Sequence, residues 1–193
     1  MPYHNFRHVV DVLQATFSFL LHLGALPPYP PHAAGQPGAA LPKSPMALLL
    51  RPFEALTLLL TAIGHDVGHP GVNNGFLTKL RAPLAQLYND RSVLESFHCA
   101  AYNQILRRHW PAVFDDIKMC HLITSSILAT DMGLHFEYMG KLHVLQAKLV
   151  NGTDGWDART IDEHSALVCA LLIKCADISN VVSQSRRPRH GAH

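Results

Sequence analysis

Six stretches of the sequence repeat apolar residues at the spacing of an α-helix, and none alternates convincingly between apolar and polar residues as β-strands do. The helical stretches are residues 9–23, 53–63, 93–106, 117–128, 134–150 and 161–178. Glycine, proline and asparagine residues stand between them, where helices are expected to end. The pattern predicts an all-α fold.

Residues 24–45 cannot continue this helical pattern. Seven of the 13 prolines and three of the 12 glycines fall in this stretch, and proline lacks a backbone donor and clashes with the preceding helical turn. We expect a Pro/Gly-rich insert of low order within a single domain over residues 1–182. Residues 183–193 include three arginines, and we expect them to form a disordered basic tail.

Composition indicates a globular protein. Hydrophobic residues make up 48% and charged residues 16% of the chain, a balance that suits a packed core rather than disorder. The net charge is +2, but without the three tail arginines it is 13 − 14 = −1. A basic face for nucleic acid is therefore not indicated. No protein partner is indicated either.

The apolar stretch 46–63 does not read as a membrane span, because Arg51, Pro52 and Glu54 interrupt it. The four cysteines form no CxxC pair, and no secretory leader is recognisable. We expect a cytoplasmic protein with neither a disulfide framework nor a zinc finger, and with no membrane partner.

Histidine is unusually frequent, with 14 copies, as many as Asp and Glu together. His4 and His8 are four residues apart, which would place both on one face of a helix, with Asp11 continuing that face. A solvated polar helix face explains such a pair as readily as a metal site does. Context has to decide between them.

The segment Gly-His-Asp-Val-Gly-His-Pro-Gly at 64–71 follows directly on an apolar helical stretch. Imidazole and carboxylate ligands together suit Zn, Fe, Mn or Mg rather than the thiolate set of a structural zinc site. His65 and Asp66 therefore indicate a metal. The alternative is a polar helix end, in which Asp66 accepts hydrogen bonds from loop amides.

Asp177 follows the apolar run 166–173. A carboxylate next to a buried helix needs a partner, since burying an unpaired charge is costly. That partner is either a metal or Lys174. Asp177 also completes a set of two imidazole and two carboxylate residues with His8, His65 and Asp66. Such a set leaves coordination positions open for water and substrate, as catalytic metals require.

In this order, the motifs resemble the catalytic core of the class I 3′,5′-cyclic nucleotide phosphodiesterases, within the HD superfamily of metal-dependent phosphohydrolases. The resemblance covers residues 3 to 182 and rests on five motifs: YHNFRH at 3–8, HDVGHPGVNN at 65–74, YNDRSVLE at 88–95, LATDM at 128–132 and KCADISN at 174–180. It implies a multi-helix phosphodiesterase-type core that hydrolyses the 3′-phosphoester bond of cyclic AMP, cyclic GMP or both to nucleoside 5′-monophosphates. The expected role is in cyclic-nucleotide signal transduction.

The resemblance also implies two divalent cations. Four residues would hold the tighter one, usually zinc: His8, His65, Asp66 and Asp177. Asp66 would bridge to the second, usually magnesium, with manganese as an alternative, whose other ligands are mostly water. Three residues match positions that orient those waters: His69, Glu95 and Thr130.

His4 matches the general acid of the family, which gives the leaving 3′-oxygen its proton; a histidine with a pKa near neutrality suits that task. Asn74 and Asn180 match polar positions near the substrate. Glu95 has a second interpretation, because residues 92–95 fit a capping box at the start of a helix. Histidines outside the motifs, His98 among them, are expected to be surface or packing residues.

The sequence departs from the family pattern in three places. Gly68 stands where many animal members have Asp. The insert lengthens the separation of His8 from His65, at a small cost because loop-closure entropy grows only with the logarithm of length. The purine-reading Gln and aromatic clamp of the family would lie beyond the last motif, and helices would precede the first. We therefore expect a partial core, truncated at both ends.

Three alternatives to an active cyclic nucleotide phosphodiesterase core remain. The chain could be a catalytically impaired helical fragment that binds metal but lacks the nucleotide pocket. It could be an inert helical module that binds a regulatory partner. It could also be another HD-type phosphohydrolase, although a histidine four residues before the ligand His8 counts against that.

Overall fold

The computed structural model describes residues 4–27 and 44–185, with side chains described as far as residue 179. Within these residues every regular element is helical, which confirms the all-α prediction. The longer helices are α1 (Phe6–Leu23), α2 (Pro52–Gly64), α5 (Val93–His109), α6 (Ile117–Leu128), α7 (His135–Leu149) and α8 (Ala158–Ser185). Shorter elements connect them: η2 (Pro45–Leu49), α3 (Asn74–Lys79), α4 (Pro83–Leu87), η3 (Pro111–Asp115) and η4 (Met132–Leu134).

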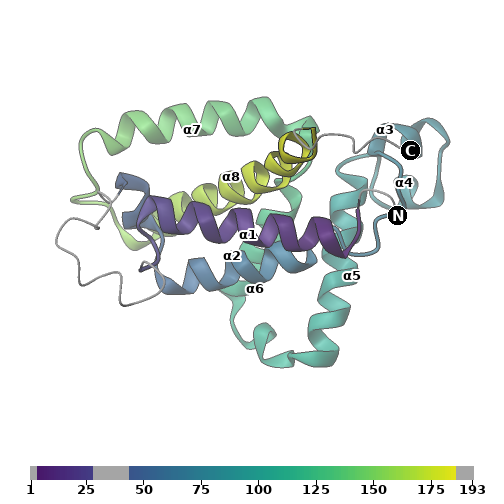
Figure 1. Cartoon of the computed structure of the whole chain (residues 1–193), viewed down its shortest axis with the longest axis horizontal. Coiled ribbons are helices and arrows are strands. Elements are labelled where there is room, and N and C mark those ends of the chain that lie inside the picture. The colour runs from purple at the N-terminus through teal and green to yellow at the C-terminus, as the bar shows by residue number, and fades with distance from the viewer. Residues whose placement is uncertain (1–3, 28–43, 186–193) are drawn as a thin grey trace, which may run out of the picture.

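Helices α1, α2, α6 and α8 surround the main core (Figure 1). Helix α1 packs on both α2 and α8, and α6 packs on the same two helices from another side. Val12, Leu58 and Ile173 are fully buried there, and burying a side chain of this size contributes about 1.5–3 kcal/mol. This packing brings the start of α1 and the end of α2 next to α8.

Helix α5 lies beside α6 and has a core cluster of its own. Tyr102 and Leu106 of α5 pack there with Ile123 and Ile127 of α6. The short helices α3 and α4 contact α5, and in Figure 1 they lie at the right of the molecule. Helix α7 packs on α8, where Leu145 and Leu149 join the main core. No helix in the described part of the chain is both long and apolar enough to cross a membrane.

Both ends of the expected insert 24–45 are ordered, so the prediction of low order is wrong there. Gly24 ends α1 in the left-handed conformation, with φ 79°, which glycine adopts without steric cost. Leu26 packs against the main core. The Ser44 N–H donates to the Leu23 carbonyl at 3.1 Å. Residues 28–43 lie outside the described residues.

The last helix extends past the domain boundary expected at residue 182. Helix α8 continues to Ser185, so residues 183–185 are helical rather than part of a disordered tail. Residues 186–193 lie outside the described residues.

Candidate metal centre

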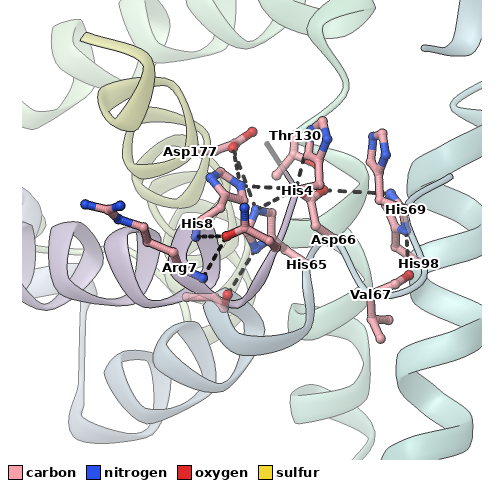
Figure 2. A network of polar contacts seen from close by, with 12 residues as sticks. His4, Arg7, His8, His65, Asp66, Val67, His69, His98, Thr130 and Asp177 are labelled. Carbon is pink, nitrogen blue, oxygen red and sulfur yellow. Dashed lines mark hydrogen bonds and ion pairs between the residues drawn. The ribbon is translucent and has the colours of Figure 1, made fainter. Parts of the chain in front are cut away.

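Four side chains from α1, the end of α2 and α8 converge on one point (Figure 2). His8 comes from the first turns of α1, and Asp177 comes from α8. His65 is the C-cap residue of α2, and Asp66 follows it. One ligand-type atom from each of the four lies within 4.8 Å of the others. The structure thus brings together the complete set of metal ligands expected from the sequence.

The centre has a buried imidazole side and a more open carboxylate side. His8 Nε2 lies 3.1 Å from Asp66 Oδ2 and 3.3 Å from Asp177 Oδ1. His65 Nε2 lies 3.5 Å and 3.7 Å from the same two oxygens. Both histidine side chains are fully buried, whereas 14% of Asp66 and 26% of Asp177 remain exposed. Solvent therefore reaches the centre along its carboxylates.

The hydrogen bonding of His65 suits a cation ligand. Its Nδ1 lies 3.0 Å from the carbonyl oxygen of Ala62, and this contact is a hydrogen bond only if Nδ1 carries the proton. Nε2 then presents a lone pair, and it is buried without a hydrogen-bond partner among the described residues. A lone pair that faces carboxylates is stabilised by a cation or a proton between them. The donor set therefore fits a divalent cation.

Electrostatics at the centre couple the histidines to the carboxylates. Burial lowers the pKa of His8, but hydrogen bonds and charge from Asp177 and Asp66 outweigh it and raise the pKa to about 9. The pKa of His65 is also raised, because the same carboxylates outweigh its burial. Burial raises the pKa of Asp177, yet the two histidines hold it well below the ordinary value. The carboxylates are thus ionised at neutral pH, as metal ligands must be.

Lys174 is not the partner of Asp177. Its Nζ donates hydrogen bonds to the carbonyl oxygens of Ala129, at 3.0 Å, and Asp131, at 2.8 Å. These two carbonyls flank Thr130, and the lysine is buried beneath them. Of the two partners considered for Asp177, the structure favours the metal centre.

His4 precedes α1 instead of lying on it. Helix α1 begins after Asn5, whose Oδ1 accepts the backbone N–H of His8 at 3.3 Å. The expectation that His4 and His8 share one helix face is therefore wrong, because the helix is capped between them. The two rings are still neighbours, with centroids 5.7 Å apart, and His4 Nε2 lies 3.9 Å from Asp66 Oδ2. Burial lowers the pKa of His4.

Three imidazole rings form a column beside Asp66, with His69 in the middle. The rings of His4 and His69 stack with centroids 3.6 Å apart and planes 9° apart. The His69 and His98 centroids are 5.4 Å apart, with planes at 22°. Burial and the neighbouring His4 lower the pKa of His69 to about 4, so its ring is neutral at pH 7.

His98 is the residue near the centre whose position the sequence did not indicate. It is buried, its Nδ1 lies 2.8 Å from the Val67 carbonyl oxygen, and its Nε2 lies 3.7 Å from Asp66 Oδ1. The expectation of a surface or packing role does not describe this contact with Asp66. A signal was present, because His98 is three residues after Glu95 and residues at that spacing share a helix face.

A cavity of about 500 Å³ adjoins the imidazole column. Five residues expected at the site line it: His4, His69, Asn74, Glu95 and Thr130. Asn180, the remaining substrate candidate, lies on α8, but its side chain is outside the described residues. The cavity therefore gathers five of the residues for which roles around substrate and water are predicted.

The expected capping box at the start of α5 does not form. Ser92 occupies the N-cap in a left-handed conformation, φ 40°, and its side chain does not cap the helix. Its hydroxyl donates instead to Asp131 Oδ2 at 2.7 Å. Asn74 supplies the cap from α3, because its Oδ1 accepts the Leu94 N–H at 2.9 Å. The capping-box interpretation of Glu95 is therefore wrong.

The amino-acid sequence matches a known protein family. The model of the 3′5′-cyclic nucleotide phosphodiesterase family matches residues 3–188. The chain belongs to this family. Membership confirms the resemblance seen in the sequence motifs. Because cyclic nucleotide phosphodiesterases depend on divalent metals, it also agrees with the metal-binding set described above.

Relatives within the phosphodiesterase family match nearly the whole chain. The 3′,5′-cyclic-nucleotide phosphodiesterase 2 of Saccharomyces cerevisiae is 35% identical over 93% of this chain and 27% of its own length. The probable 3′,5′-cyclic phosphodiesterase pde-6 of Caenorhabditis elegans is 35% identical over 92% of this chain and 21% of its own length. The crystal structure of yeast caPDE2 has a TM-score of 0.74 and 43% identity, over 93% of this chain and 36% of that one.

The chain thus spans about a fifth to a third of these phosphodiesterases. The structure of LmjPDEB1 in complex with IBMX shows the same fold, with a TM-score of 0.70 and 32% identity over 94% of this chain and 48% of that one.

Proposed function

We propose that this chain carries the metal centre of a cyclic nucleotide phosphodiesterase and hydrolyses the 3′-phosphoester bond of cyclic AMP or cyclic GMP. The products would be nucleoside 5′-monophosphates, in cyclic-nucleotide signalling. One observation carries the proposal: two histidines and two aspartates have ligand atoms within 4.8 Å of one another, and His4 stands beside them.

His8, His65, Asp66 and Asp177 would hold one cation. Two imidazoles and two carboxylates suit several divalent ions, and the resemblance to the phosphodiesterase motifs favours zinc among them. Asp66 is proposed to bridge this cation and a second one. The orientation of its carboxylate supports this role, because Oδ2 lies toward His8 and His65 while Oδ1 lies toward His98. We propose magnesium or manganese for the second position. When bound, such a cation pair neutralises charge on the phosphoryl oxygens and acidifies the attacking water.

His4 is proposed as the general acid that protonates the leaving 3′-oxygen. Burial lowers its pKa, so its acid form is not abundant in the free protein at neutral pH. A phosphodiester anion next to the ring would favour the charged imidazolium. The substrate would thus promote the protonation of His4, while stacking on His69 holds the ring in place.

The cavity beside the centre is proposed as the place of the phosphate and its waters. His69, Glu95 and Thr130 line it, and they are proposed to orient water around the second cation. Asn180 remains a proposed substrate contact. The amide of Asn74 is engaged by Glu95 and Leu94 at the start of α5, so we do not propose the expected substrate contact for it.

The test is hydrolysis of cyclic AMP and cyclic GMP by the purified chain with Zn²⁺ and Mg²⁺, with metal content measured on the same samples. His4→Ala should keep the zinc and lower turnover by about 10²–10⁴-fold, the usual contribution of general acid catalysis. Equal turnover in both proteins would refute the role of His4. Stoichiometric zinc with no turnover in the unmodified chain would refute hydrolysis by this chain and leave a metal-binding fragment.

The cytoplasm is proposed as the compartment. All four cysteines are free in the structure: Cys99, Cys120, Cys169 and Cys175. Free thiols are typical of reducing compartments, which supports this proposal.

A further inference from the structure

Asn74 joins two elements at the edge of the cavity. It is the first residue of α3, and both polar ends of its amide contact neighbouring residues at the start of α5. Nδ2 donates to Glu95 Oε2 at 2.9 Å, and Oδ1 accepts the Leu94 N–H at 2.9 Å. A backbone donor and a carboxylate acceptor admit only one orientation of an amide, so the group is fixed.

The contact with Leu94 replaces a missing cap. The first backbone N–H groups of a helix need acceptors from outside it, and the N-cap residue Ser92 supplies none from its side chain. Asn74 satisfies one of them from another helix. Its position relative to α5 is therefore set by the backbone of α5 as well as by Glu95.

The contact with Glu95 acts on a carboxylate that lines the cavity. Burial raises the pKa of Glu95, and the hydrogen bond from Asn74 opposes this change. The bond also restricts rotation of the carboxylate, since one oxygen is held by a donor that is itself fixed. Asn74 therefore favours a charged Glu95 in a single orientation, as an acceptor for ordered water requires.

We propose that Asn74 is a positioning residue, which aims the Glu95 carboxylate at water around the second cation and does not bind the nucleotide. The inference rests on the proposed metal-dependent function, since the second cation is part of it. Its mechanism is indirect: any effect of Asn74 on cation binding passes through Glu95.

A double-mutant cycle tests this route. The variants are Asn74→Ala, Glu95→Gln and the double variant, each with zinc already bound at the first position, and the measurement is Mn²⁺ affinity from the electron paramagnetic resonance signal of free Mn²⁺. Each single change should weaken Mn²⁺ binding about 10–100-fold, the range for groups that orient metal-bound ligands. The double variant should bind Mn²⁺ no more weakly than Glu95→Gln. Losses that multiply, or an unchanged affinity in Asn74→Ala, would overturn the proposal.

Asp116→Ala controls for loss of a helix cap. Asp116 caps α6 through its bond from the Met119 N–H, at 3.0 Å. This variant should lower the melting temperature without changing Mn²⁺ affinity. If Asn74→Ala does not fold, Asn74→Ser keeps an acceptor for Leu94 and replaces it in the cycle.

Two further measurements distinguish this proposal from a direct nucleotide contact and from the proposed hydrolytic function. A direct nucleotide contact would raise KM in Asn74→Ala even in the Glu95→Gln background, and that result would overturn the positioning role. If the unmodified chain does not hydrolyse cyclic nucleotides but the Mn²⁺ cycle shows the expected coupling, the proposed function fails and the positioning role stands.

Discussion

The imidazole rings of His4 and His69 stack face to face, with centroids 3.6 Å apart and planes 9° apart. His69 belongs to the turn after α2, whereas His4 lies just before α1. The position of the proposed general acid thus depends on a ring from another part of the chain.

Replacing His69 tests this dependence. In His69→Ala the His4 Hε1 proton should lose the ring-current shift and move downfield, and turnover should fall about 10–100-fold, as for other orienting groups. His69→Phe should retain most of the shift, because a flat ring remains. The measurement is a proton–carbon NMR spectrum of the histidine side chains. An unchanged His4 resonance in His69→Ala would show that the stack does not persist in solution.

Removing the cation should lower stability. A ligand present at 1,000 times its Kd stabilises the folded state by about 4 kcal/mol, which for a chain of this size corresponds to a melting temperature higher by about 10 °C. We expect that difference between zinc-loaded and chelator-treated protein in thermal unfolding. Asp177→Asn, which keeps the shape but removes the charge of one ligand, should show a much smaller difference. The same difference in both proteins would place the zinc elsewhere.

The chelated protein should lose stability as pH rises from 6.5 to 9. The pKa of His8 is raised from 6.5 to about 9 in the folded state. Its contribution is therefore fully present below 6.5 and disappears as pH rises through about 9. Denaturant titrations across this range measure the slope. Zinc affinity should change in the opposite direction, rising about tenfold per pH unit for one displaced proton. Stability of the chelated protein that rises with pH would contradict the coupling.

Gly64 should not tolerate a side chain. A Cβ at this position would overlap the ring of Tyr102, whose hydroxyl donates to the Leu60 carbonyl at 2.8 Å. Gly64→Ala should cost about 1–3 kcal/mol, the usual effect of overpacking, and should weaken zinc binding because His65 is the next residue. Gly140→Ala is the control, since nothing lies within 4 Å of its Cβ, and it should be neutral or stabilising by about 0.5–1 kcal/mol. Equal stabilities would exclude the overlap.

Lys174→Met should destabilise the turn that carries Thr130. The change leaves the carbonyls of Ala129 and Asp131 without their donor, at a cost of about 1–3 kcal/mol. Lys174→Arg retains donors and should lose less. Chemical denaturation gives the stability, and hydrogen exchange should show faster exchange at the amides of 129–131 in Lys174→Met only. Unchanged exchange there would mean that the lysine does not hold the turn.

The long helices could be predicted because their apolar faces persist over many turns. The expected stretch 53–63 differs from α2 (Pro52–Gly64) by one residue at each end, and 117–128 coincides with α6 (Ile117–Leu128). Helices α3 and α4 were not predicted, because their six and five residues are too few to show a helical repeat of apolar residues. Local features mark where they begin: the Asn73 side chain caps α3, and Pro83 is the first residue of α4.

In the candidate site, too, some residues could be predicted from the sequence and others could not. Ligand residue types and their order along the chain indicated His8, His65, Asp66 and Asp177, and the structure brings these residues together. The contact of His98 with Asp66 depends on how α5 packs beside the turn after α2. The cap from Asn74 likewise depends on how α3 packs against α5. The spacing of Ser92 and Glu95 predicted a capping box there instead, which does not form. The spacing of Glu95 and His98 places both on one face of α5, but a spacing does not show which other element that face meets.

The placement of the four ligands has a consequence for the order of events during protein synthesis. His8, His65 and Asp66 leave the ribosome long before Asp177, because α1 and α2 precede α8 along the chain. A nascent chain that presents only the first three has an incomplete donor set, so tight cation capture must wait until α8 has emerged and docked on α1. A cation held by all four side chains would therefore bind late in synthesis, after the residues of α8 that complete the main core have emerged.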